Sequence, residues 1–162
     1  MINMSENILP YKGLESFKFG DKIESVRLML KEEKISFIQC MGEKQYIHPE
    51  LKNEIIVIKD SIKLYFVDGI LFEIGLENGF KGQLPNGICI GMDIDKAVTV
   101  DSNLEYDDDE EAFVSSKGYT VIDDAASNLV SYIEIYVPEV ESSEDFFLYD
   151  WLERFKERKT HR

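Results

Sequence analysis

Alternating apolar and polar positions predict strands in the first half of the chain. Residues 54–58 are rich in β-branched side chains and end at the turn Lys59-Asp60-Ser61. Apolar and polar side chains then alternate over residues 62–66, and Asp68-Gly69 is typical of a tight hairpin turn before residues 70–76. The pattern therefore predicts a three-stranded antiparallel meander.

A helix is predicted ahead of this meander. Starting at Ile23, apolar residues recur at helical spacing to about Glu33. Asp21 is a suitable N-cap for this helix, and Glu24 would complete a capping box with it. A short strand is expected over residues 35–39, between the helix and the meander.

The second half of the chain echoes the first. Residues 19–26 read FGDKIESV and residues 90–98 read IGMDIDKAV. Each copy would place a glycine ahead of a short amphipathic helix, with strands following after an interval. In the second copy we expect strands at residues 118–122 and 129–137, joined by a turn at residues 123–128.

These elements predict one α+β domain over residues 1–162, built on an antiparallel sheet. Two helix-plus-sheet units, residues 14–80 and 88–138, would reflect a possible duplication. A C-terminal helix is expected over residues 142–159, capped by Ser142 or Ser143. Acidic side chains fill its first turn and basic ones its last, which suits the helix dipole. Its aromatic stripe is expected to dock on the sheet.

Most of the net charge of −14 lies in one stretch of the chain. Residues 93–150 carry 17 acidic side chains and two basic ones, whereas residues 1–92 are nearly balanced and residues 151–162 are basic. Such a region attracts cationic proteins and repels nucleic acid and anionic lipid. We therefore expect a basic protein as the partner and no direct binding to nucleic acid or to membranes.

The acid run, residues 107–111, lies within this stretch. A run of this kind taken alone is usually a solvated loop. Because the rest of the chain is nearly neutral, we interpret the run as part of a recognition surface with aromatic anchors. The predicted partner-binding residues are Asp93, Asp95, Glu105, Tyr106, Asp107, Asp108, Asp109, Glu110, Glu111, Phe113, Tyr119, Asp123 and Asp124.

The sequence offers no motif for catalysis. His48 and His161 lie in no nucleophile or zinc motif, and Cys40 and Cys89 form no CxxC pair. The N-terminal residues contain no basic segment followed by an apolar one, so we expect no secretory signal. Together with two unpaired thiols, this predicts a cytoplasmic protein that is not an enzyme.

Metal and cofactor binding are also not expected. Oxygen-bearing side chains alternate from Asp101 onward, as they do in a calcium-binding loop. The glycine required at the sixth position is Tyr106, and the acid required at the twelfth is Ala112. The sequence therefore predicts no cofactor and no resident metal.

Five segments resemble those of a known class of proteins. They are residues 11–13, 19–26, 67–69 and 90–95, together with the acid run. With these segments, which are spread over most of the chain, the sequence resembles an immunity protein of a bacterial contact-dependent growth-inhibition or related polymorphic-toxin system.

This resemblance implies a cytoplasmic antidote that binds the basic C-terminal nuclease domain of a toxin as a one-to-one complex. The antidote would occlude the active site of the toxin, for which we expect a ribonuclease. Two alternatives stay open from the sequence. One is a small-molecule or peptide-binding module that uses the face of the sheet, and the other is a hydrolase that uses His48 with a distant carboxylate.

Overall fold

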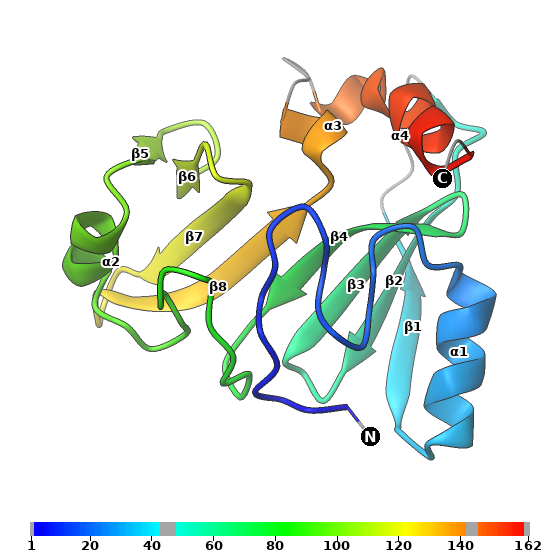
Figure 1. The fold of residues 1–162 in the computed structure, drawn as a ribbon, viewed down its shortest axis with the longest axis horizontal. Coiled ribbons are helices and arrows are strands. Elements are labelled where there is room, and N and C mark those ends of the chain that lie inside the picture. The colour runs from blue at the N-terminus through cyan, green and yellow to red at the C-terminus, as the bar shows by residue number, and fades with distance from the viewer. Residues whose placement is uncertain (1, 43–47, 142–145, 161–162) are drawn as a thin grey trace.

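A computed structural model describes residues 2–42, 48–141 and 146–160 (Figure 1). It contains one eight-stranded antiparallel sheet, with strand order β1-β2-β3-β4-β8-β7-β6-β5. The strands are β1 (Phe37–Met41), β2 (Asn53–Ile58), β3 (Ile62–Val67), β4 (Ile70–Leu76), β5 (Leu104–Asp107), β6 (Ala112–Ser115), β7 (Tyr119–Asp124) and β8 (Leu129–Tyr136). The helices are α1 (Ile23–Glu32), α2 (Ile94–Val100), α3 (Pro138–Glu141) and α4 (Trp151–Thr160), with a 3₁₀ turn η1 (Phe146–Leu148). The predicted α+β class is confirmed.

The sheet consists of two similar halves, since α1 precedes β1–β4 and α2 precedes β5–β8. The two glycines of the sequence echo occupy equivalent places in these halves. The Gly20 amide donates to the Leu71 carbonyl at 2.8 Å, and the Gly91 amide donates to the Val130 carbonyl at 2.8 Å. Both glycines have positive φ, 97° and 88°, a conformation that glycine adopts most easily. The echoed segments therefore make the same backbone contacts.

The two halves meet where β4 pairs with β8. Leu71 and Val130 occupy equivalent places, because each accepts the hydrogen bond from one of the two glycines. Four residues further along each strand, Gly75 of β4 is therefore equivalent to Glu134 of β8. These two residues are also direct partners across the sheet. An approximate two-fold axis therefore passes between Gly75 and Glu134.

Apolar side chains of both halves form a continuous core on one face of the sheet. Ile56, Leu64, Ile74 and Ile133 are fully buried in it. Side chains from α1, α2 and the N-terminal arm (residues 2–22) complete the core. In Figure 1 the arm can be followed in front of the strands, and α1 is seen beside β1. Burial of this face explains the alternation of buried and half-buried residues along β2 and most of β3.

The opposite face of the sheet, here called the open face, is much less covered. The strand register places one row of residues across it: Ile38, Val57, Lys63, Gly75, Glu134, Thr120, Val114 and Glu105. Except for Gly75, every member of this row is half-buried or exposed. At one end of the face, Phe146 and Tyr149 of the C-terminal segment line a pocket with Tyr65 and Glu73.

Gly75 allows a tyrosine to lie across the open face. A Cβ atom at this position would lie 1.8 Å from the Tyr132 hydroxyl oxygen, which is 3.1 Å from the Tyr65 hydroxyl oxygen. We expect Gly75→Ala to lower the free energy of unfolding by about 1–3 kcal/mol in urea denaturation, because Tyr132 must move. In a Tyr132→Ala background the same change should cost much less, and an equal cost would show that the contact with Tyr132 is not the cause.

The ends of two predicted helices differ from the structure. Helix α1 is capped at Lys22 without a side-chain hydrogen bond, while Asp21 instead accepts a bond from the Lys18 amide at 2.8 Å. The predicted capping box is therefore wrong. Helix α4 begins at Trp151, well after the predicted start, and the proposed caps Ser142 and Ser143 lie outside the described residues. The expected docking of this helix is seen in the full burial of Trp151 and Phe155.

The strand predictions were accurate in the centre of the sheet and incomplete at its edges. Strand β4 has the predicted bounds, and β2, β3, β7 and β8 differ by one or two residues at an end. The first strand lies at Phe37–Met41, two residues later than expected. Strands β5 and β6 were not predicted. They pair as a hairpin with the acid run at its tip, so the run is not an isolated loop.

Candidate functional site

The acid run forms a tight turn between β5 and β6. The Asp107 carboxylate accepts hydrogen bonds from the amides of Asp109 and Glu110, at 2.9 and 3.1 Å. Glu111 adopts a positive φ of 51°, which completes the reversal of the chain. The carboxylate of Asp107 therefore orders the backbone of the turn. The side chains of Asp108 and Asp109 are exposed to solvent.

This hairpin forms one side of an acidic hollow of about 680 Å³. The residues that line it are Asn103, Glu105, Tyr106, Asp107, Asp108, Asp109, Val114, Ser115, Ser116 and Glu141. Five of them carry carboxylates and none carries a basic side chain. None of these carboxylates forms an ion pair with any residue that the structure describes. The hollow therefore holds uncompensated negative charge in a concave surface, an arrangement that strengthens the local potential.

Glu141, at the end of α3, also lines the hollow. Its carboxylate accepts a hydrogen bond from the Tyr11 hydroxyl of the N-terminal arm. The same hydroxyl is 3.3 Å from the carbonyl oxygen of Ser116, in the loop between β6 and β7. Burial and the neighbouring Glu141 raise the pKa of Tyr11, which stays protonated. Three segments that are distant in sequence thus fix the shape of the hollow.

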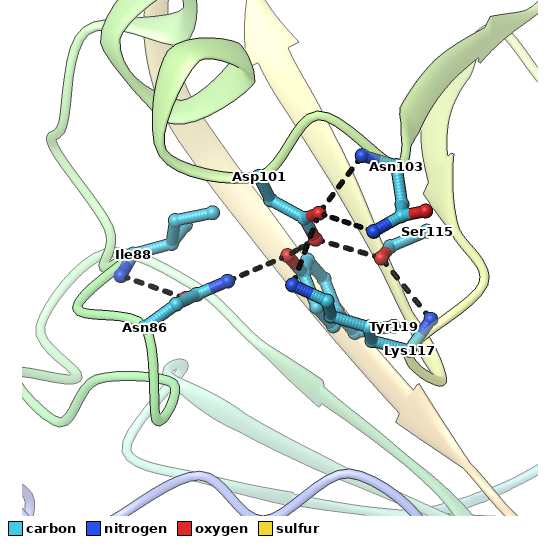
Figure 2. Close-up of polar contacts among 7 residues, drawn as sticks. All are labelled: Asn86, Ile88, Asp101, Asn103, Ser115, Lys117 and Tyr119. Carbon is cyan, nitrogen blue, oxygen red and sulfur yellow. Dashed lines mark hydrogen bonds and ion pairs between the residues drawn. The ribbon is translucent and has the colours of Figure 1, made fainter.

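A buried polar network supports the floor of the hollow (Figure 2). Asp101, which is fully buried, accepts hydrogen bonds from the Tyr119 hydroxyl, from the Ser115 hydroxyl at 2.8 Å and from the Asn103 amide at 2.9 Å. The ammonium group of Lys117 lies 3.4 Å from the same carboxylate. Because Asn103 and Ser115 also line the hollow, the network fixes its floor.

Two groups of this network, Asp101 and Tyr119, keep fixed protonation states near neutral pH. Burial alone would raise the pKa of Asp101, but hydrogen bonds from Tyr119, Asn103 and Ser115 outweigh it and hold the pKa well below its usual range. Burial and the bond to Asp101 raise the pKa of Tyr119 to about 12. Asn86, which also appears in Figure 2, donates a further bond to the Tyr119 hydroxyl at 3.0 Å. The network therefore supports the floor of the hollow without a change of protonation at Asp101 or Tyr119 near neutral pH.

The structure brings together part of the predicted binding surface. Glu105, Tyr106 and the carboxylates of residues 107–109 all line the hollow. Tyr106 is 53% exposed and packs edge-to-face on the half-buried Phe113, with ring centroids 5.1 Å apart. Tyr106 thus meets the requirement for an exposed aromatic anchor. Tyr119 does not, because it is 1% exposed, and its prediction as an anchor is wrong.

The remaining predicted carboxylates do not line the hollow. Asp93 caps α2 by accepting bonds from the amides of Asp95 and Lys96, at 2.9 and 3.2 Å. Asp124 accepts bonds from the backbone and side chain of the β7–β8 turn, where burial contributes little and these bonds lower its pKa. Asp123 precedes it in β7. Asp93 and Asp124 therefore have local structural contacts, and none of the three residues lines the hollow.

The structure also shows the surroundings of the histidine and the cysteines that a hydrolase could use. The Nδ1 atom of His48 is 3.1 Å from the Glu50 carboxylate two residues away, and His48 is half-buried while Glu50 is exposed. Cys40 is an exposed free thiol and Cys89 a half-buried one. Among the described residues, no group of three or more histidine, cysteine, aspartate or glutamate side chains is placed to hold a metal ion. Glu50 lines a hollow of about 400 Å³ together with Lys52 and Asn53, and His48 is not among the residues that line it.

Comparisons with protein-family models, curated proteins and solved structures gave no match. Function must therefore be argued from the geometry of this chain. Within the part of the chain that the structure describes, no helix has both the length and the apolar character needed to cross a bilayer.

Proposed function

We propose that this chain is an immunity protein that binds a basic nuclease domain of a toxin and neutralises it. The complex would be one-to-one and cytoplasmic, and the target would be a ribonuclease. The observation that supports this proposal is the acidic hollow, in which five carboxylates line a concave surface and no lining residue is basic. The chain acts by binding, and it performs no catalysis itself.

The charge of the hollow suits such a target. A nuclease must attract a polyanion, so basic side chains surround its active site. The carboxylates of the hairpin turn and of Glu141 can pair with those side chains where phosphates would otherwise bind. Charge complementarity of this kind accelerates association, while an aromatic contact such as Tyr106 would slow dissociation.

The alternative of a small-molecule module finds weaker support. The pocket at one end of the open face is about 250 Å³ and is lined mainly by apolar and aromatic side chains. Ligand pockets usually occupy roughly 300–1,000 Å³ and enclose most of their ligand. The acidic hollow is larger, but its carboxylates suit a cationic protein surface better than an apolar ligand.

Co-expression tests this proposal directly. The gene beside that of this chain is expected to encode a secreted protein with a basic C-terminal domain. That domain alone should arrest bacterial growth, and co-expression of this chain should restore it. The purified proteins should co-elute as a one-to-one complex in which RNA cleavage falls in proportion to the added chain.

The control is an unrelated basic domain of similar size, which should neither co-elute nor be inhibited. A complex that still cleaves RNA at the full rate would contradict occlusion of the active site. Failure of the two proteins to associate at physiological ionic strength would contradict the proposed function as a whole.

A further inference from the structure

Two glutamates lie side by side at the centre of the open face. Glu134 of β8 is opposite Gly75 of β4, and Glu73 of β4 is opposite Tyr136 of β8. The strand register places both side chains on the same face as diagonal neighbours, and both residues are half-buried. Two neighbouring carboxyl groups that are partly withdrawn from water do not readily ionise together, and burial with the charge of Glu134 raises the pKa of Glu73. We therefore expect the free protein to hold a shared proton at this position.

Tyrosines surround the carboxyl pair. Tyr65 is opposite Glu73 on the neighbouring strand β3, and its hydroxyl oxygen is 3.1 Å from that of Tyr132. Tyr132 in turn lies over Gly75, which has no side chain of its own. Tyr136 is opposite Glu73 on the other side. Tyr136 is buried, whereas Tyr65 and Tyr132 are half-buried. Partly exposed aromatic side chains on a sheet face are typical of a protein interface.

The charges around the pair are predominantly negative. Burial, the charge of Glu134 and the charge of Glu110 on the β5–β6 hairpin raise the pKa of Glu73 well above its usual value. Burial and Glu110 also raise the pKa of Glu134. Lys63, the basic residue in this row of the sheet, is already 3.2 Å from the carboxylate of Glu77. The pair thus lies in a repulsive field that an added cation would relieve.

We propose that the open face binds an arginine side chain of the basic partner, with its guanidinium group against Glu73 and Glu134 and between the surrounding tyrosines. This inference rests on the proposed function and extends its interface from the hollow to the centre of the sheet. The two surfaces are continuous, because the row that contains Glu134 ends at Glu105, which lines the hollow.

The chemistry of the site selects a guanidinium group. Its planar donors match carboxylate oxygens in pairs, and its flat surface stacks on tyrosine rings. A lysine ammonium group would satisfy the charge but would stack less well. An apolar segment would leave the carboxyl pair without a counter-ion, and a nucleic acid would be repelled.

Binding of arginine is expected to release a proton from the carboxyl pair. The guanidinium group pairs with two ionised carboxylates, so the shared proton leaves for solvent when the complex forms. Affinity should therefore rise with pH until the free pair is itself ionised. The titratable and charged groups that face the pair are Lys63, Tyr65, Glu77, Glu110, Tyr132, Tyr136 and Tyr149. Because the tyrosine pKa values are also raised, the carboxyl pair is the source of the proton.

Calorimetry with octa-arginine tests this assignment. Titration of the intact protein near neutral pH, in phosphate and in Tris, gives the number of protons released from the difference in apparent enthalpy. We expect a net release of protons for the wild type. The variant Glu73→Gln/Glu134→Gln should lose this release and bind about tenfold more weakly or worse. The matched variant Asp107→Asn/Asp108→Asn should bind more weakly and keep the release.

The outcomes separate this inference from the proposed function. Unchanged affinity and proton release in Glu73→Gln/Glu134→Gln would overturn the site on the open face and leave the hollow intact. No binding of octa-arginine at low ionic strength would overturn both. If the glutamine variant does not fold, NMR of the wild type decides: octa-arginine must shift the side-chain signals of Glu73, Glu134 and Tyr132, and shifts confined to the hollow would refute the assignment.

Discussion

Replacing Asp101 with alanine is expected to lower the free energy of unfolding by about 3–5 kcal/mol. The change removes the acceptor for the buried hydroxyls of Ser115 and Tyr119 and leaves Lys117 without its counter-ion. Unsatisfied buried donors are costly because they have also lost water. Urea denaturation at neutral pH measures the effect, which should appear in the midpoint and not in the slope.

Asp108→Ala is the matched control, because Asp108 is exposed and lies in the same half of the sheet. It should change stability by no more than about 0.5 kcal/mol. A loss for Asp101→Ala that is no larger than this would show that the network contributes little.

The contribution of Asp101 should also depend on pH with a defined sign. Hydrogen bonds hold its pKa below the value of about 3.9 expected in the unfolded chain. The ionised group therefore stabilises the fold fully above that value, and the contribution is lost as pH falls through the folded-state pKa. The difference in stability between wild type and Asp101→Asn should shrink below about pH 4. A difference that is constant down to lower pH would contradict this account.

Charge reversal in the hairpin turn, by Asp107→Lys, Asp108→Lys and Asp109→Lys together, should slow association with the basic partner by about 10- to 1,000-fold at low ionic strength. The reason is that these carboxylates contribute most of the charge around the hollow. Stopped-flow measurement should also show a much flatter dependence of the rate on salt, because screening then has less attraction to remove.

A control with the same change in net charge is available outside the predicted binding surface. Glu15, Glu32 and Glu153 are exposed and lie in the N-terminal arm, on α1 and on α4, outside the hollow. Their replacement by lysine should slow association far less than reversal in the turn. Equal effects of the two triple variants would show that net charge matters and that the hollow is not the interface.

Local signals in the sequence predicted the central strands well. The Asp68-Gly69 turn occurs as expected, and β4 begins and ends at the predicted residues. In both cases the information is local, since alternation fixes the strand and turn residues fix its ends. The same reasoning placed a cap at Asp21, which was wrong because its carboxylate bonds to the Lys18 amide instead. The equivalent position in the second half, Asp93, does cap its helix through its side chain.

The edge strands beside the acid run were missed for a physical reason. Strand β5 has three exposed residues out of four, so no apolar alternation marks it. It is held by its pairing with β6 and by burial of Leu104. Pairing depends on a neighbour that is already in place, and charged residues at an edge strand are common in native sheets. The acid run could therefore be recognised from the sequence, but not its position at a hairpin tip.

The tertiary partners within the site could not be predicted. Glu141 meets Tyr11 from the other end of the chain, and Glu73 meets Glu134 only because β4 pairs with β8. Tyr119 was expected at the surface, but the buried Asp101 gives its hydroxyl group a partner inside the protein. Sequence separation hides such contacts, since neither residue carries a local pattern that points to the other.

The axis between Gly75 and Glu134 also bears on stoichiometry. A molecule made of two like halves would ordinarily present each of its surfaces twice. Here the carboxyl pair lies beside the axis and joins positions that are not equivalent, because Glu73 corresponds to Tyr132 and Glu134 to Gly75. The site proposed on the open face therefore occurs once in the chain, and a titration should saturate at one partner molecule despite the internal symmetry.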